Sequence, residues 1–290
     1  MEQRNTKPIR CIVKLGGAAI TCKNELETID EENLMTVSSQ LRQSLMFGSA
    51  SQKVSGMDWS KRLGFSEPPT VDSDFSDQPV VGSKSFVVVH GAGSFGHFQA
   101  SKSGVHKGGL SQPLVKAGFV ATRISMDAAD VSMVVNAIDA GFIPVLHGDA
   151  VLDSSQECTI LSGDVIISHL AAKLKPEYVV FLTDVYGVYD RPPTEPDAVL
   201  LQEIAVREDG SWSVVKPTLQ GTGKPEFTVA SHDTTGGMVT KISEAAMIAR
   251  LGIDVYIVKV GTEHSLRALD GSLRGEIPND WRGTALRLVR

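Results

Sequence analysis

The chain has 290 residues, of which 42% are hydrophobic and 21% charged, and its formal net charge is −6. This composition is typical of a globular protein, and the length allows one large α/β domain or two small ones. The negative charge disfavours contact with a nucleic-acid backbone, so we expect no nucleic-acid partner. No apolar run reaches the ~18 residues of a membrane span, and the N-terminal stretch has no apolar secretion segment, so we expect a chain without a membrane span.

The three cysteines are Cys11, Cys22 and Cys158. Their number is odd, they are far apart, and their spacing is not that of metal ligands. We therefore expect free thiols in a reducing compartment, a cytoplasmic protein, and no metal site built from protein side chains.

The first predicted strand covers residues 11–15, an apolar run interrupted by Lys14 and followed by Gly16 and Gly17. Thr28 and Glu31 have the spacing of a capping box, and apolar residues then recur at helical spacing, which predicts a helix over 29–45. Residues 48–84 are rich in Ser, Gly, Pro and Asp without periodicity. We interpret them as a mobile insertion within a single domain of residues 1–290, either a solvated loop or a lid.

The stretch FVVVHGAGSFGH at 86–97 combines a buried strand, a glycine-rich loop and the start of a helix. Three glycines let the backbone come close to a ligand, and free N–H groups at a helix start attract anions, most often phosphate. His97 is either a capping or structural residue or, in its protonated form, a ligand for that anion. His90 and His147 are interpreted as packing or loop residues.

Strand and helix patterns alternate along the remainder of the chain. The predicted helices are 113–140, 165–174, 231–251 and 265–269, and the predicted strands are 142–147, 178–182, 199–204, 212–215, 253–258 and 283–289. Such alternation, with buried strands that end in Gly or Asp loops, predicts an α/β fold with an open, mostly parallel sheet. Ligands of such sheets bind at the carboxyl ends of the strands.

Phosphoryl transfer needs cations around the moving group. Lys14, inside an apolar strand, and Lys241, in the helix after Gly237, are the candidates. A buried lysine needs an anionic partner, which is either a phosphate or an Asp in a structural ion pair. Asp164 and Asp184 would orient lysines or hold Mg²⁺ through water, or would serve as a helix cap or turn residue. The sequence lacks the P-loop and protein-kinase motifs, and it lacks the acidic ribose ligand of a dinucleotide site.

Five motifs together resemble the amino-acid kinase superfamily, and within it the isopentenyl phosphate kinase family of plant type. They are KLGG at 14–17, HGAGSFGH at 90–97, LSGD at 161–164, LTDVYGVYD at 182–190 and TTGGMVTK at 234–241. The resemblance implies a three-layer αβα sandwich and a homodimer. It implies transfer of the γ-phosphate of ATP, with Mg²⁺, to an isoprenoid monophosphate, isopentenyl phosphate.

The resemblance also implies roles for individual residues. Lys14, His97 and Lys241 would be catalytic, and the acceptor would contact Ala92, Gly93, His97 and Gly163. The ATP-binding residues would be Lys14, Gly16, Gly17, Ala18, Gly93, Asp184, Gly187, Tyr189, Gly237 and Lys241. Ala92 replaces a glycine common in the family, and Tyr186 stands where relatives often carry an acidic residue.

Two kinds of alternative remain open at this point. One is a kinase for another small phosphate, phosphonate or amino-acid-type acceptor, which the lining of the acceptor pocket would decide. The other is a non-catalytic nucleotide-binding sensor, which the intact set of transfer-site cations disfavours.

Overall fold

The computed structural model describes residues 9–22, 28–46, 86–91, 103–116, 131–139, 142–153, 155, 157–218 and 237–289. The predicted insertion at 48–84, the glycine loop from residue 92 to His97, and the helix segments 117–130 and 231–236 lie outside these residues.

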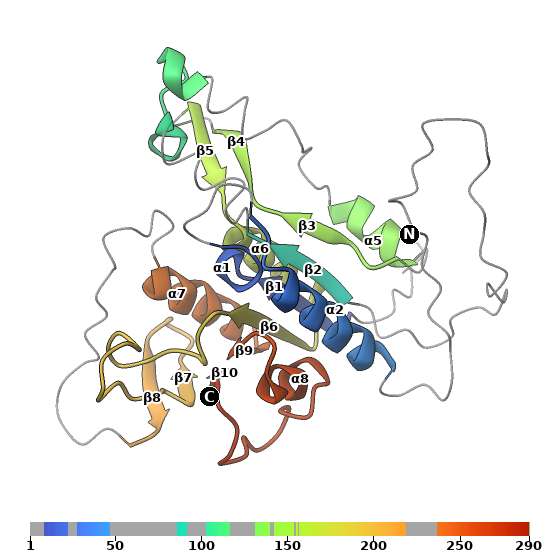
Figure 1. The fold of residues 1–290 in the computed structure, drawn as a ribbon, viewed down its shortest axis with the longest axis vertical. Coiled ribbons are helices and arrows are strands. Elements are labelled where there is room, and N and C mark those ends of the chain that lie inside the picture. Colours follow the sequence, from blue (N-terminus) through green and yellow to red (C-terminus); the bar gives the residue numbers. More distant parts are fainter. Residues whose placement is uncertain are drawn as a thin grey trace, which may run out of the picture.

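Eight strands form one sheet in the order β3-β2-β1-β6-β9-β10-β7-β8 (Figure 1). Their bounds are β1 Cys11–Leu15, β2 Phe86–His90, β3 Val145–His147, β6 Tyr178–Thr183, β7 Glu203–Val206, β8 Trp212–Lys216, β9 Asp254–Lys259 and β10 Thr284–Leu288. The first five strands of this order are mutually parallel, whereas β10 is antiparallel to β9 and β8 is antiparallel to β7. The prediction of an open, mainly parallel sheet is confirmed.

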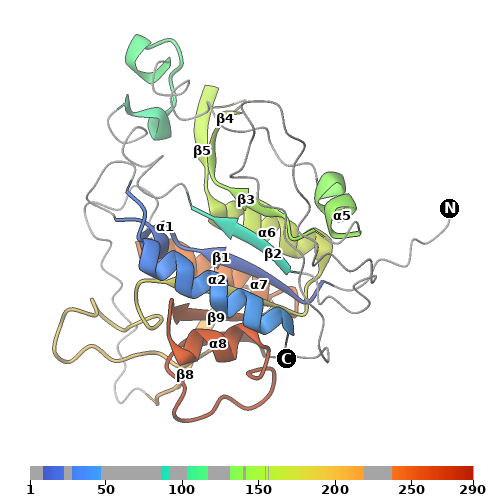
Figure 2. The same cartoon turned by 45° about the vertical axis from the view of Figure 1, so that its right-hand side comes forward.

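Helices cover both faces of the sheet and make three layers (Figure 2). One face carries α1 (Gly17–Ile20), α2 (Glu31–Met46) and α8 (Glu263–Leu269), and the other carries α5 (Val131–Asp139), α6 (Gly163–Leu174) and α7 (Gly237–Ala249). Successive strand side chains point to opposite faces, so Ile12 and Phe181 join the core under α6 and α7, whereas Val13 and Leu182 join the core under α2 and α8. Burial on both faces explains why these strands are continuous apolar runs.

A separate two-stranded hairpin, β4 (Asp149–Asp153) and β5 (Glu157–Leu161), extends away from the sheet beyond β3 (Figure 1). It packs on η2 (Val105–Lys107) through a small apolar cluster that includes Val105, Ala150 and Cys158. The sequence analysis did not predict this hairpin.

The predicted start of α2 also needs correction. Ile29 forms an isolated antiparallel bridge with Thr21 and is not helical, so Thr28 and Glu31 do not form a capping box. Asp30 precedes the helix instead, and its carboxylate accepts a hydrogen bond from the backbone N–H of Asn33 at 3.0 Å. An Asp in this position satisfies one of the amides that a helix start leaves without a partner.

Cys11, Cys22 and Cys158 are all free thiols. Within the described residues, none of the helices combines the length and the apolar character needed to cross a membrane.

Candidate active site

The site lies at the edge of the sheet where β2, β1, β6 and β9 end. The register aligns these ends, because Leu15 pairs with His90 on one side and with Leu182 on the other, and Thr183 pairs with Lys259. Strand β10 runs the other way, and its first residue, Thr284, pairs with Ile257 of β9. The residues just before β10 therefore reach the same edge as the carboxyl ends of the parallel strands.

Lys14 and Asp164 form a buried ion pair at this edge. The exposed fractions are 5% for Lys14 and 6% for Asp164, and Lys14 Nζ contacts Asp164 Oδ1. Asp164 is the second residue of α6, and Ser162 caps this helix by accepting a hydrogen bond from the N–H of Val165 at 3.3 Å. The sequence left open a phosphate or an Asp as the partner of Lys14. In the structure the Asp164 carboxylate is in contact with Lys14, and this contact fixes the position of the ammonium group.

Gly163 lets the start of α6 lie directly against β1 and β2. A Cβ atom at this position would lie 3.3 Å from the carbonyl oxygen of His90 and 3.4 Å from Cε of Lys14. The first distance is tighter than most contacts of a Cβ atom, so a side chain here would shift the start of α6 or the end of β2 slightly, beside Lys14. The predicted acceptor residue Gly163 and the predicted catalytic residue Lys14 are therefore neighbours.

The loop after β1 is tied to both neighbouring strands. The N–H of Gly16 donates to the carbonyl of Leu182 at 2.8 Å, and the N–H of Gly91 donates to the carbonyl of Leu15 at 3.1 Å. Gly17 and Ala18 then open the short helix α1. The predicted phosphate loop of residues 16–18 thus lies between the ends of β2 and β6, beside Lys14.

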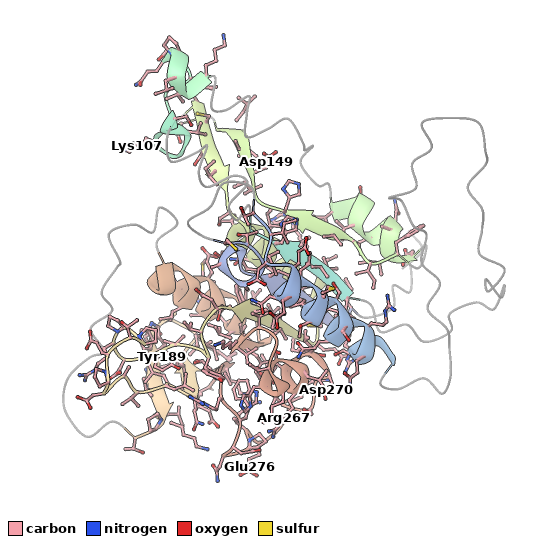
Figure 3. The ribbon with its side chains drawn as sticks, viewed as in Figure 1. Lys107, Asp149, Tyr189, Arg267, Asp270 and Glu276 are labelled. Carbon is pink, nitrogen blue, oxygen red and sulfur yellow. The ribbon has the colours of Figure 1, made fainter. Side chains whose placement is uncertain are left out.

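The loop after β6 contains the predicted nucleotide residues Asp184, Gly187 and Tyr189. Asp184 is exposed, and Tyr189 is half-buried on the side of β7 and β8 (Figure 3). A Cβ atom on Gly187 would lie 2.5 Å from Oγ1 of Thr284, so this glycine packs closely on β10. Packing accounts for the glycine, and its contact with a nucleotide stays a prediction.

Two cations at the same edge, Lys259 and Arg282, were missed by the sequence analysis, and both lie against the ring of Tyr186. The Arg282 guanidinium carbon lies 4.0 Å from the ring centroid of Tyr186, and Lys259 Nζ lies 5.3 Å from it. Burial raises the pKa of Tyr189, and the positive charge of the nearby Arg282 guanidinium opposes that rise. Only the antiparallel direction of β10 brings Arg282 here, and no sequence pattern signals that direction.

His90 and His147 stack side by side at the ends of β2 and β3, with ring centroids 5.1 Å apart. Nδ1 of His90 lies 2.9 Å from the carbonyl oxygen of Gly91, and Nδ1 of His147 lies 2.9 Å from that of Gly148. A carbonyl oxygen only accepts, so each Nδ1 carries a proton. Burial lowers the pKa of His90, which keeps its ring neutral near pH 7. The interpretation of both histidines as packing residues agrees with this geometry.

The remaining predicted site residues are only partly visible. Ala92, Gly93 and His97 lie outside the described residues, as does the side chain of Lys241. Gly237 begins α7, and the backbone of Lys241 follows in its second turn. Within the described ranges, no three His, Cys, Asp or Glu side chains gather in a way that could hold a metal ion.

Comparison with known proteins identifies the family. The chain is 60% identical over 328 aligned residues to the isopentenyl phosphate kinase of Arabidopsis thaliana, which covers 100% of this chain and 99% of that protein. The chain belongs to the isopentenyl phosphate kinase family. The isopentenyl phosphate kinase of Methanothermobacter thermautotrophicus (strain Delta H) is 30% identical, over 90% of this chain and 95% of that protein. Residues 117–259 also match the Amino acid kinase family.

Solved structures support the same assignment. A structure described as an X-ray structure of isopentenyl phosphate kinase superposes with a TM-score of 0.61 at 25% identity, over 95% of this chain and 99% of that one. A carbamate kinase from Giardia lamblia, at 13% identity and a TM-score of 0.51, shares the fold. The amino-acid kinase fold expected from the sequence motifs is therefore confirmed for this isopentenyl phosphate kinase family member.

Proposed function

We propose that the chain transfers the γ-phosphate of ATP to isopentenyl phosphate and releases isopentenyl diphosphate and ADP. The observation that carries this proposal is the buried Lys14 ammonium group, held by Asp164 where the glycine loop after β1 and the end of β2 meet the start of α6. Identity of 60% to a relative with this name, over the whole chain, supports the choice of acceptor.

The acceptor enters as an ionised phosphate, so the reaction needs no general base. The γ-phosphorus–oxygen bond to ADP breaks as a phosphate oxygen of the acceptor forms the new bond, and negative charge spreads over the transferred group. Lys14 neutralises part of that charge, and its pairing with Asp164 keeps it in place between turnovers.

The other residues bind and position the two substrates in this proposal. The N–H groups of Gly17 and Ala18 face the phosphates of ATP, and Gly16, whose own N–H is bonded to Leu182, makes the turn that presents them. Residues 184–189 border the nucleoside of ATP. Residues proposed on the acceptor side are Ala92, Gly93, His97 and Gly163, and those proposed against the β- and γ-phosphates are Gly237 and Lys241.

Mg²⁺ enters this proposal together with ATP. Mg²⁺ is usually held by substrate phosphates, waters and one or two carboxylates, not by a cage of protein ligands. The exposed Asp184 at this edge fits such a minor role. The ion would neutralise charge on the β- and γ-phosphates.

The first experiment is a coupled ADP-release assay with ATP, Mg²⁺ and a panel of acceptors. The panel holds isopentenyl phosphate, dimethylallyl phosphate, acetylglutamate, UMP and fosfomycin. Selective turnover of the isoprenoid phosphates is expected. Turnover of another acceptor would retain the kinase and replace the substrate, whereas ATP binding without any turnover would favour a nucleotide sensor.

His97→Ala tests the acceptor side of the site. We expect this change to reduce turnover of isopentenyl phosphate far more than binding of ATP, because the imidazole is proposed to bind the acceptor phosphate. Equal losses of turnover and of ATP affinity would contradict that role.

The proposal further includes a single domain over residues 1–290, a homodimer and a cytoplasmic location. Strands from both ends of the chain, β1 and β10, share one sheet, which supports the single domain.

The homodimer interface is proposed at the edge strand β3. Exposed apolar side chains at or just before this strand support it, namely Phe142, Ile143 and Val145. Light scattering coupled to size-exclusion chromatography measures the mass, and a monomer would contradict the dimer. The three free thiols support a reducing compartment, and microscopy of a tagged protein tests it.

A further inference from the structure

Arg282 is exposed, yet its position is fixed from several sides. Its guanidinium carbon lies 4.0 Å from the Tyr186 ring centroid, and its positive charge is close enough to Tyr189 to oppose the rise in the pKa of that side chain. Its backbone N–H donates to Nδ1 of His264 at 3.4 Å. An arginine stacked in this way loses little further freedom when it binds an anion.

Lys259 lies against the same ring and shares a sheet face with Lys14. Its Nζ is 5.3 Å from the Tyr186 centroid. Side chains alternate along strands, and Ile12 and Ile257 belong to one core, so Lys14 and Lys259, two residues further along, point to that same face. Strands β1 and β9 are separated by β6, which places them about 10 Å apart.

The partners of these two cations are aromatic groups and not carboxylates. In the part of the chain that the structure describes, neither Lys259 nor Arg282 forms an ion pair with Asp or Glu. A tyrosine ring attracts a cation without cancelling its charge. The edge of the sheet therefore presents two positive charges, held in place, about two strands away from Lys14.

We propose that Lys259 and Arg282, held by Tyr186, form an anion subsite that binds the non-transferred phosphates of ATP. The inference rests on the proposed function, because it takes Lys14 as the position of the transferred phosphate. The guanidinium fork suits paired phosphate oxygens, and the ammonium group adds a second charge. This subsite binds the nucleotide at the sheet edge, while Lys14 neutralises charge on the transferred group.

Calorimetric titration of ATP, ADP and adenosine tests the subsite, together with KM values for ATP and for isopentenyl phosphate. For Arg282→Ala we expect roughly tenfold weaker binding of ATP and ADP, unchanged binding of adenosine, and a shallower salt dependence. KM for ATP rises while KM for isopentenyl phosphate stays the same. Arg282→Lys retains the charge but not the guanidinium fork, so its affinity for ATP and ADP should lie between those of wild type and Arg282→Ala.

Two further variants keep the test decisive. Lys259→Gln removes the second charge and leaves the segment before β10 unchanged. We expect the same weaker binding of ATP and ADP in this variant, which tests the subsite even where Arg282→Ala fails to fold. Arg274→Ala removes an equal charge at the opposite end of the sheet, where Arg274 pairs with Glu177, and it should leave ATP binding unchanged.

The outcomes separate the inference from the function on which it rests. Unchanged ATP affinity in both Arg282→Ala and Lys259→Gln, or an equal loss for ATP and adenosine, overturns the phosphate subsite. A wild-type protein that binds no ATP overturns the proposed function itself.

Discussion

The pair of Lys14 with Asp164 and the cluster of Lys259, Tyr186 and Arg282 lie along one edge of one sheet, but they differ in how each cation is held. Lys14 is 5% exposed and contacts a carboxylate of α6. Arg282 is exposed and lies on an aromatic ring, with no carboxylate partner among the described residues.

This difference follows from the cost of removing a charge from water. A buried ammonium group requires a compensating anion, so Lys14 without Asp164 would be strongly destabilising. An exposed guanidinium group stays hydrated and needs only an orienting surface, which Tyr186 provides. Burial thus gives one cation a fixed position, whereas exposure leaves the charge of the other available to an anion.

Lys14→Met should have the largest effect. Turnover should fall about 10²- to 10³-fold, because a group that stabilises charge in the transition state is lost. The free energy of unfolding should also fall by about 3–5 kcal/mol, because the Asp164 carboxylate remains buried without its partner. Enzyme assays and urea denaturation measure the two effects.

The double variant Lys14→Met with Asp164→Asn separates these two effects. It should recover most of the stability, since the unpaired buried charge is gone, while turnover stays low. Recovery of turnover in the double variant would remove Lys14 from the mechanism.

Gly163→Ala tests how closely the buried pair is positioned. The new methyl group would lie 3.3 Å from the His90 carbonyl oxygen and 3.4 Å from Lys14 Cε. We expect turnover to fall roughly tenfold, because small displacements of reacting groups have large effects on rate. Gly275→Ala is the matched control, since a Cβ atom there has no neighbour within 4 Å and turnover should not change.

Gly187→Ala should reduce stability in the other region, where the loop that carries Tyr186 packs on β10. The added Cβ atom would lie 2.5 Å from Thr284 Oγ1, and overpacking of this kind costs about 1–3 kcal/mol. Urea denaturation measures the loss of unfolding free energy. Thr284→Ser, combined with Gly187→Ala, is the control, because serine keeps the hydroxyl that accepts a hydrogen bond from the Val188 N–H. An alanine variant as stable as wild type would show that the loop shifts freely relative to β10.

His90 should produce the smallest effect, which depends on pH. Burial lowers its pKa in the folded state, so between that value and the ordinary value of about 6.5 the unfolded chain binds more protons. This contribution to stability is complete above about pH 6.5 and declines as the pH falls. His90→Asn should flatten the decline in unfolding free energy from pH 7 to pH 5, because the group whose pKa burial lowers is then gone. A steeper decline in His90→Asn would contradict the assignment.

The local patterns of the sequence determined most of the fold. Buried strands such as residues 178–182 were predicted within a residue of their observed ends, because a strand covered on both faces is apolar throughout. Lys14 was singled out for the same reason, as the one charge in an apolar strand, and the motifs around it identified the family that the relatives confirm.

The tertiary structure alone decided the features that depend on contacts between residues far apart in the chain. Asp164 as the partner of Lys14 is 150 residues away, and the antiparallel direction of β10 brings Arg282 to Tyr186. The hairpin β4–β5 likewise depends on contacts with η2. A sequence pattern records which residues are apolar, but strand direction and ion pairing depend on which segments meet, and these contacts are set only when the sheet assembles.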